Sequence, residues 1–226
     1  MPEHTSSHFN QELETVRTEV MRMGGLVEKQ LQLVLSALQQ ADTNQLSYIV
    51  NDDDAINRLE VEIDDACQTI IARRQPAASD LRFVLAVSRM IVDLERIGDE
   101  LKKIALIMQT IATKYELSAQ TLHDTYRLAL MTQPMLRRAL DAFARLDISA
   151  LEDVQQADKL IDRDYRSQSR VLITYMMQDP TSIELFVEMM MANKSIERVG
   201  DHAKNIAEHV VYLVQGIDVR HTKKDG

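Results

Sequence analysis

The sequence is poor in the residues that break helices and in the residue that forms disulfides. Its 226 residues include only 6 glycines, 4 prolines and 1 cysteine, and aromatic side chains make up 4% of the chain. The single cysteine, Cys67, excludes an internal disulfide and any metal site built from several thiolates. Because glycine and proline punctuate turns and loops, their scarcity, together with 12 methionines, favours an all-α protein.

The chain also lacks an excess of positive charge and a long apolar run. Its formal net charge of −9 argues against a general nucleic-acid binder, whose affinity would come from clustered Lys and Arg. No apolar stretch approaches the ~20 residues that cross a bilayer, and the first residues lack the basic and apolar regions of a signal peptide. We therefore expect a cytoplasmic protein with no transmembrane segment and no nucleic-acid partner.

Turn and capping residues divide the chain into six expected helices, near residues 6–40, 45–74, 80–113, 119–146, 150–178 and 180–214. Asp42 begins a turn with N-cap chemistry for the second helix, and Ser79 and Asp179 are candidate N-caps for the third and sixth. Ser149 and Glu152 have the spacing of a capping box at the start of the fifth helix.

Two of these helices contain residues that disfavour a regular helix. Gly24 and Gly25 interrupt the first, and each costs about 1 kcal/mol relative to alanine. We expect either a bend or a close packing contact there. Pro134 lies within the fourth helix and predicts a kink.

The two halves of the chain read as copies of one three-helix unit. Ile56 and Ile161 stand at equivalent places 105 positions apart, and Glu95 and Glu197 at equivalent places 102 positions apart. We expect an all-α fold of two tandem three-helix bundles related by internal pseudo-twofold symmetry. The expected boundaries are residues 6–114 for the first repeat, 118–216 for the second, and 217–226 for a flexible tail.

A seven-residue motif appears once in each copy, as DLERIGD at 93–99 and SIERVGD at 195–201. Each motif holds a Glu and an Asp four residues apart, Glu95 with Asp99 and Glu197 with Asp201. In a helix such residues lie one turn apart on the same face, where like charges repel by a few tenths of a kcal/mol. A bound cation would remove that repulsion.

Each expected hairpin brings a second polar pair to the level of the motif. Residues equidistant from the turn of an antiparallel hairpin lie beside each other, which yields two candidate sites. In the second repeat this places Asp158 beside Asp201 and Asp162 beside Glu197, and in the first it places Asp53 beside Asp99 and Asn57 beside Glu95. Oxygen donors suit Mg²⁺, Mn²⁺, Ca²⁺ or iron, and Zn²⁺ less well.

A structural interpretation of the same carboxylates remains open. Arg96 and Arg198, within the motifs, could neutralise them in surface ion pairs worth about 0–1 kcal/mol. Spacing by itself leaves a metal and these ion pairs equally open. The spacing also places Asp93 on another side of the helix, and His202 is the only histidine near either site.

Other motifs have simpler interpretations. Met189–Met191 fall at core positions, Cys67 lies on an apolar stripe that predicts a buried thiol, and Asn193 is a polar seam residue of the kind that sets helix register. No Glu is followed by a His three residues later, so a di-iron bundle is not indicated. The sequence also has no nucleophile elbow and no Walker-type loop.

Over almost its whole length the chain resembles the PhoU family of bacterial phosphate-uptake regulators. The resemblance lies in the duplicated three-helix unit and in DLERIGDEL at 93–101, SIERVGDHA at 195–203, RRQPAASDL at 73–81, MGGLVE at 23–28 and DHAKNIAE at 201–208.

This resemblance implies metal ions at the acidic motifs: Mg, Mn, Fe or Zn bound by Glu95 and Asp99, and by Glu197 and Asp201 with Asp158 and Asp162. The pair Asp53 and Asn57 departs from the family pattern by its Asn, so we expect the first site to fill less well than the second.

The resemblance also implies a function. Family members are non-catalytic, cytoplasmic negative regulators of the phosphate regulon, usually homodimers, which link the ATPase subunit of the phosphate ABC transporter to the phosphate sensor histidine kinase. Two other hypotheses for the function stay open. The protein could be a metal-dependent phosphate-binding or phosphoesterase protein, or a purely structural helical scaffold.

Overall fold

The computed structural model describes residues 3–219, without the side chains of residues 3–7 and 51–54. The side chain of the candidate ligand Asp53 and most of the expected tail therefore lie outside the described residues. Among the described residues, all regular structure is helical, which confirms the all-α expectation.

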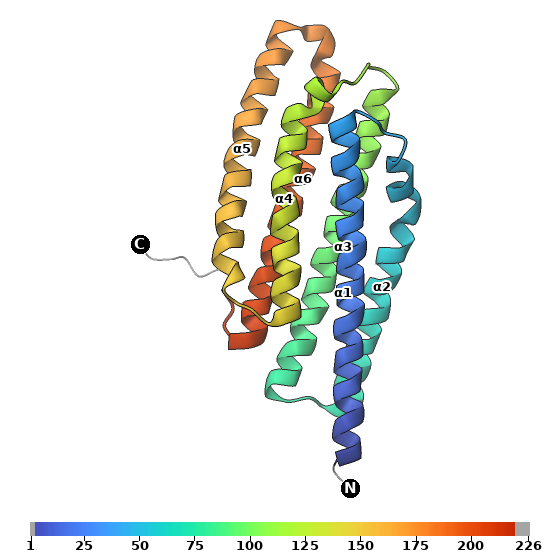
Figure 1. Cartoon of the computed structure of the whole chain (residues 1–226), viewed down its shortest axis with the longest axis vertical. Helices are drawn as coiled ribbons and strands as arrows, with labels where there is room; N and C mark the ends of the chain where they lie inside the picture. The colour runs from blue at the N-terminus through green and yellow to red at the C-terminus, as the bar shows by residue number, and fades with distance from the viewer. Residues whose placement is uncertain (1–2, 220–226) are drawn as a thin grey trace.

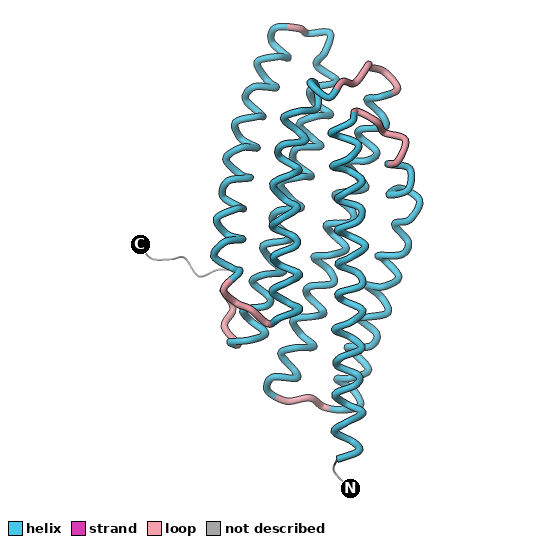
Figure 2. Tube along the Cα trace, viewed as in Figure 1, coloured by secondary structure: helices cyan, strands magenta, loops and turns pink. Residues whose placement is uncertain are grey.

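Between residues 3 and 219, six long helices run along the long axis of the molecule, and the turns that join them gather at its two ends (Figures 1 and 2). Their bounds are α1 Glu3–Gln40, α2 Leu46–Arg74, α3 Ala78–Ala112, α4 Ala119–Arg145, α5 Ala150–Gln178 and α6 Ile183–Gln215. A short 3-10 helix, η1 Pro180–Ser182, precedes α6. No described helix is long and apolar enough to cross a membrane.

The first turn of each repeat is built by an aspartate, as expected at Asp42 but not at Asp147. Asp42 Oδ1 accepts the Asn44 amide at 2.9 Å, and Asp147 Oδ1 accepts the Ser149 amide at the same distance. These are equivalent positions of the repeat. Because Asp147 already fixes the turn, Ser149 adopts a helical conformation and its side chain caps nothing in the described structure. The capping-box prediction was wrong.

The third and sixth helices differ in how well their starts were predicted. The expected cap Ser79 lies inside α3, because the chain leaves α2 through left-handed Gln75 (φ 48°) and α3 begins earlier, after extended Ala77. That prediction was also wrong. Asp179 does cap as expected and accepts the Thr181 amide at 3.0 Å, but it opens η1 instead of α6 directly.

Gly24 is a close packing contact between α1 and α4. A Cβ placed there would lie 2.6 Å from Leu140 Cδ2, whereas a Cβ on Gly25 would meet nothing within 4 Å. Helix α1 continues through both glycines, as α4 does through Pro134. Of the two alternatives for this pair, the structure therefore selects close packing, and only at Gly24.

The internal repeat is visible in the packing. A Cβ on Gly98 would lie 3.2 Å from Ile56 Cδ1, and one on Gly200 would lie 3.3 Å from Ile161 Cδ1. Besides the isoleucine, a Cβ on Gly98 would approach Gln30, and one on Gly200 would approach Met135. These two residues also stand 105 positions apart. Helices α1 and α4 run in opposite directions, as do α3 and α6 (Figure 1). The two units are thus related by a pseudo-twofold axis that lies perpendicular to the long axis of the molecule.

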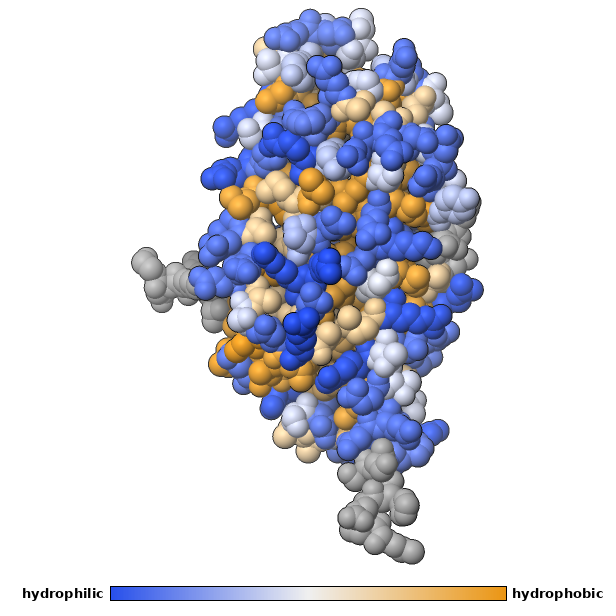
Figure 3. Space-filling view, in the orientation of Figure 1, coloured by the Kyte–Doolittle hydropathy of each residue, from blue (hydrophilic) through white to orange (hydrophobic). Residues whose placement is uncertain are grey.

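The two units share one core. Their buried apolar side chains form a single continuous cluster, and α3 packs extensively on α6 while α1 packs on α4. Phe83 of the first unit stacks on Phe143 of the second, with ring centroids 6.3 Å apart. Outside this core, polar side chains cover much of the face formed by α1 and α4, with apolar residues between them (Figure 3).

Candidate metal centres

In the second repeat, two predicted ligands converge on one cation. Lys204 Nζ donates to Asp158 Oδ2 at 2.7 Å and to Asp201 Oδ1 at 3.1 Å. Asp158 comes from α5, whereas Asp201 and Lys204 lie one turn apart on α6. The predicted pairing of Asp158 with Asp201 at the same level of the hairpin is therefore confirmed. The cation between them is an ammonium group of the chain itself.

This ion pair offsets the cost of burying the lysine charge better than the cost of burying the aspartate charge. Burial raises the pKa of Asp158, and the hydrogen bond from Lys204 opposes that rise only in part. Burial lowers the pKa of Lys204, but its bonds to Asp158 and Asp201 outweigh burial and leave that pKa raised. The single ammonium group of Lys204 thus does not fully offset the burial of Asp158, whereas two carboxylates stabilise the charge of Lys204.

The other two predicted ligands of this repeat each contact a cation on their own helix. Glu197 is 12% exposed, and its Oε2 lies 2.5 Å from Lys194 Nζ. Asp162 Oδ2 lies 3.9 Å from an Arg166 nitrogen. Both cations are more exposed than the carboxylates that they neutralise.

In the first repeat, Arg96 contacts both motif carboxylates, at 3.6 Å from Glu95 Oε2 and 3.9 Å from Asp99 Oδ2. Asn57 is exposed on α2. Glu60 of α2 is a nearby carboxylate that the spacing argument missed. Burial raises its pKa, and repulsion from neighbours that include Asp99 adds to the rise.

Within the described part of the chain, no three Asp, Glu, His or Cys side chains are close enough to hold one ion. The donor chemistry nevertheless fits a hard cation, because Asp158 and Asp201 already converge on a single positive charge. A metal at that place requires the flexible Lys204 side chain to swing away.

The motif's first residue has a different role, which the sequence did not indicate. Asp93 is only 8% exposed and accepts three hydrogen bonds across the interface between the repeats. His202 Nδ1 lies 2.8 Å and Asn205 Nδ2 3.0 Å from its Oδ1, and His209 Nε2 lies 3.0 Å from its Oδ2. His202, considered as a neighbour of the metal site, is thus engaged with Asp93. The sequence contained one indication of this cluster: polar residues recur at positions 202, 205 and 209, on one face of α6.

These bonds keep a buried carboxylate ionised. Burial raises the pKa of Asp93, but the hydrogen bonds from His202, His209 and Asn205 outweigh it and leave that pKa lowered. A related cluster surrounds buried Glu100.

The cluster around Glu100 is the twofold-related counterpart of the cluster around Asp93. Glu100 Oε1 lies 2.9 Å from Lys103 Nζ and 3.3 Å from an Arg198 nitrogen, and Ser195 also hydrogen-bonds to this carboxylate. Positions 93 and 195 are equivalent in the repeat, as are 100 and 202. The Asp93–His202 and Ser195–Glu100 contacts are therefore the same contact in two copies with different residues.

Comparison with known proteins identifies the relatives of this chain. A family model described as PhoU domain matches residues 20–108 and 125–210, one segment in each repeat. A Pseudomonas aeruginosa protein named phosphate-specific transport system accessory protein PhoU homolog is 46% identical over 218 residues, 96% of this chain and 90% of that protein. The Escherichia coli phosphate-specific transport system accessory protein PhoU is 42% identical over 223 residues, 98% and 91% of the two chains.

Solved structures agree in fold. The crystal structure of PhoU from Pseudomonas aeruginosa superposes with a TM-score of 0.86 at 44% identity, covering 92% of this chain and 100% of that one. A phosphate transport system regulatory protein PhoU from Streptococcus pneumoniae superposes with a TM-score of 0.84 at 29% identity, covering 93% and 99%.

Proposed function

Because this chain belongs to the PhoU family, we propose that it is an accessory protein of phosphate-specific transport and a negative regulator of the phosphate regulon. The observation that carries the proposal is the match of both repeats to proteins named for that accessory role, at 42–46% identity over nearly the whole chain. In this role it is cytoplasmic and non-catalytic, and it restrains phosphate uptake when phosphate is plentiful.

The proposed mechanism is that of a stiff helical adaptor. The two repeats share one core, so they form a single body with two related outer surfaces. These surfaces would contact the ATPase subunit of the phosphate ABC transporter and the phosphate sensor histidine kinase, and would report the state of transport to the kinase. Family resemblance suggests that the adaptor is a homodimer.

Deletion of the gene tests the regulatory role. In a strain grown in high phosphate, a regulon reporter should be repressed with the gene present and expressed without it, and a plasmid copy should restore repression. Normal repression in the deletion strain would contradict the proposal.

A binding experiment tests the partners. Purified protein, immobilised through its C-terminus, should retain the transporter's ATPase subunit and the kinase's cytoplasmic portion, and should sediment as a dimer. Retention of neither protein would contradict the adaptor mechanism while leaving the regulatory role to the deletion test.

We further propose that the acidic motifs bind divalent or iron-type ions, with the second repeat filling better than the first. Elemental analysis of protein purified without chelator should detect metal. The double variant Asp158→Asn with Asp201→Asn should lose more of it than Glu95→Gln with Asp99→Asn. Asp153→Asn is a matched control, because Asp153 is an exposed carboxylate on α5 paired only loosely with Arg138 at 3.7 Å. Equal losses from both repeats would contradict the unequal filling.

The rival function makes a separate prediction. A phosphoesterase would turn over phosphate esters with added Mn²⁺ or Mg²⁺ and would lose that activity in Asp201→Ala. We expect no turnover in the wild-type protein.

A further inference from the structure

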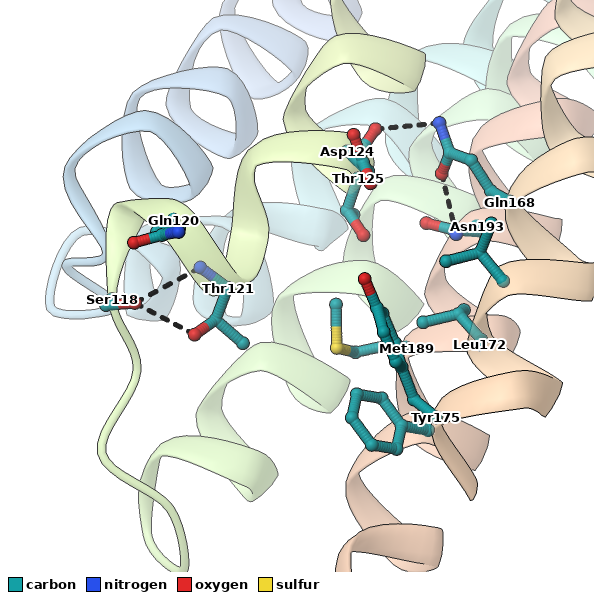
Figure 4. Close-up of a pocket in the computed structure, with 12 residues that line it drawn as sticks. Ser118, Gln120, Thr121, Asp124, Thr125, Gln168, Leu172, Tyr175, Met189 and Asn193 are labelled. Carbon is teal, nitrogen blue, oxygen red and sulfur yellow. Dashed lines mark hydrogen bonds between the residues drawn. The ribbon is translucent and has the colours of Figure 1, made fainter. Parts of the chain in front are cut away.

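A pocket of about 390 Å³ opens between α4, α5 and α6, at the end of the second repeat where η1 joins α5 to α6. Its floor is formed by the buried side chains of Thr125, Leu172, Met189 and Asn193. Figure 4 shows Thr125 and Asn193 side by side, above Leu172, Met189 and Tyr175. The volume lies within the range of about 300–1,000 Å³ that is usual for small-molecule sites.

A chain of amides determines which atom Asn193 presents to this pocket. Gln168 Nε2 donates to the backbone oxygen of Asp124 at 2.9 Å and to Asp164 Oδ2 at 3.0 Å. Since both partners can only accept, the other end of Gln168 must be its oxygen. That oxygen accepts from Asn193 Nδ2 at 3.0 Å. Asn193 therefore has its nitrogen engaged and its oxygen directed elsewhere.

Two buried polar atoms of the pocket floor have no hydrogen-bond partner among the described residues: Asn193 Oδ1 and Thr125 Oγ1. Asn193 is 1% exposed and Thr125 is wholly buried. Leaving a buried polar atom unsatisfied costs about 1–3 kcal/mol, so native proteins rarely do so without a reason. The floor thus offers one acceptor, from the amide, and one group that can donate or accept, from the hydroxyl.

The first repeat serves as an internal reference for these positions. At the places equivalent to Thr125, Gln168, Asn193, Leu172 and Tyr175 it has Val20, Ile63, Ile91, Cys67 and Ile70, all buried. The same helical scaffold therefore forms a dry apolar core in one copy and a polar pocket in the other. A residue needed only to set helix register, as proposed above for Asn193, does not account for a second unsatisfied group on a neighbouring helix.

The lining also restricts the charge of a ligand. Within the described structure, the residues that line the pocket include no Lys, Arg or His, and the one charged member is Asp124. An anion such as phosphate would meet no positive charge there. The walls are apolar and aromatic, with the rings of Tyr175 and Phe186 5.5 Å apart. This combination fits an uncharged molecule with an apolar or aromatic body and an N–H or O–H donor.

We propose that the α4–α5–α6 pocket of the second repeat is a binding site for an uncharged small molecule that donates a hydrogen bond to Asn193 Oδ1 and exchanges one with the Thr125 hydroxyl. The site is separate from the acidic motifs and does not depend on the regulatory role proposed above.

Benzamide is a suitable probe, because its N–H can reach the amide oxygen while its own oxygen accepts from the hydroxyl. Titration into the full-length protein, followed by the methyl NMR signals of Leu172 and Met189, should produce saturable shifts with a dissociation constant on the order of 1 mM, as expected for a fragment of this size. Benzoate has the same shape but is anionic and lacks the donor, so it should produce no saturable shift.

The first repeat supplies the variants. Thr125→Val and Asn193→Ile introduce the equivalent residues of the dry core, and the double variant should bind benzamide at least about tenfold more weakly, with Thr125→Val alone intermediate. Thr125→Val keeps the side-chain shape, so it tests the site even if the double variant does not fold. The proposal is overturned if benzamide gives no saturable shift, if benzoate binds equally well, or if both folded variants bind as tightly as the wild type.

Discussion

At the scale of single residues, this protein neutralises its carboxylates with cations from its own chain. Lys204 lies between Asp158 and Asp201, and Arg96 contacts Glu95 and Asp99. A regular i, i+4 pair of acids is thus not enough to define a metal site. In the second repeat the two acids come from different helices and converge on one cation.

Lys204→Gln should strengthen metal binding at the second repeat. The variant removes the ammonium group that a metal ion must displace while keeping a side chain of similar length. We expect Mn²⁺ affinity, measured by isothermal titration calorimetry on chelator-treated protein, to rise by about two- to fivefold, since an ion pair open to solvent is worth about 0–1 kcal/mol and about 1.4 kcal/mol corresponds to a tenfold change.

Lys159→Gln is the matched control, because this neighbour of Asp158 forms no ion pair within the described residues and should leave the affinity unchanged. Weaker binding in Lys204→Gln would indicate that the lysine supports the site instead of competing for it.

Asp93→Ala should destabilise the fold in a pH-dependent way. It leaves the partly buried side chains of His202 and Asn205 and the buried side chain of His209 without their acceptor, which should lower the free energy of unfolding by about 3 kcal/mol. The pKa of Asp93 is lowered in the folded state, so its contribution is complete above the unfolded value of about 4 and is lost as pH falls through the folded value. The difference between wild type and variant should therefore shrink below about pH 4.

Urea unfolding at several pH values measures this difference. Glu14→Ala is the control, because Glu14 is 68% exposed and lies 3.9 Å from Arg17. Its effect should stay below about 0.5 kcal/mol at every pH. A pH-independent cost of Asp93→Ala would mean that the charge of Asp93 is not what the three partners stabilise.

At the scale of elements, packing between helices decides what a local signal means. The Gly24–Gly25 pair in α1 is one signal in the sequence, yet only Gly24 faces another helix. The candidate caps behaved similarly: Asp179 caps as expected, whereas Ser149 does not, because Asp147 fixes that turn. Side chains that satisfy a helix end are interchangeable locally, so the sequence cannot rank two neighbouring candidates.

Adjacent glycines provide a matched pair of substitutions in α1. Gly25→Ala should raise the free energy of unfolding by about 0.5–1 kcal/mol, because alanine favours a helix and meets nothing there. Gly24→Val should lower it by about 1–3 kcal/mol, because the added atoms overlap buried Leu140. Thermal unfolding followed by circular dichroism compares them directly. Stabilisation by both substitutions would show that α1 and α4 can move apart at little cost.

At the scale of the whole molecule, the two repeats are covalent copies that share an interior. One apolar cluster extends through both, and the polar clusters around Asp93 and Glu100 lie between α3 and α6. Neither repeat can unfold without exposing the other's buried surface.

The full chain should therefore unfold in one cooperative transition. Calorimetric and van't Hoff enthalpies should agree, and a probe on Tyr48 in the first repeat should report the same midpoint as one on Tyr175 in the second. Two separated transitions would mean that the α3–α6 interface is weaker than its burial indicates.

The sequence by itself determined the number of helices, the duplication and the faces that carry the acidic pairs. These features depend on local periodicity and on spacing along one helix, which are written directly in the order of residues. The level pairing of Asp158 with Asp201 was also predictable, since a short hairpin leaves little freedom in register.

Only the tertiary structure decided which cation each carboxylate meets, that Asp93 joins the two repeats, and that Asn193 and Thr125 line one pocket. Each of these depends on how helices far apart in the chain approach one another. Many side chains satisfy the same local pattern, and packing selects among them.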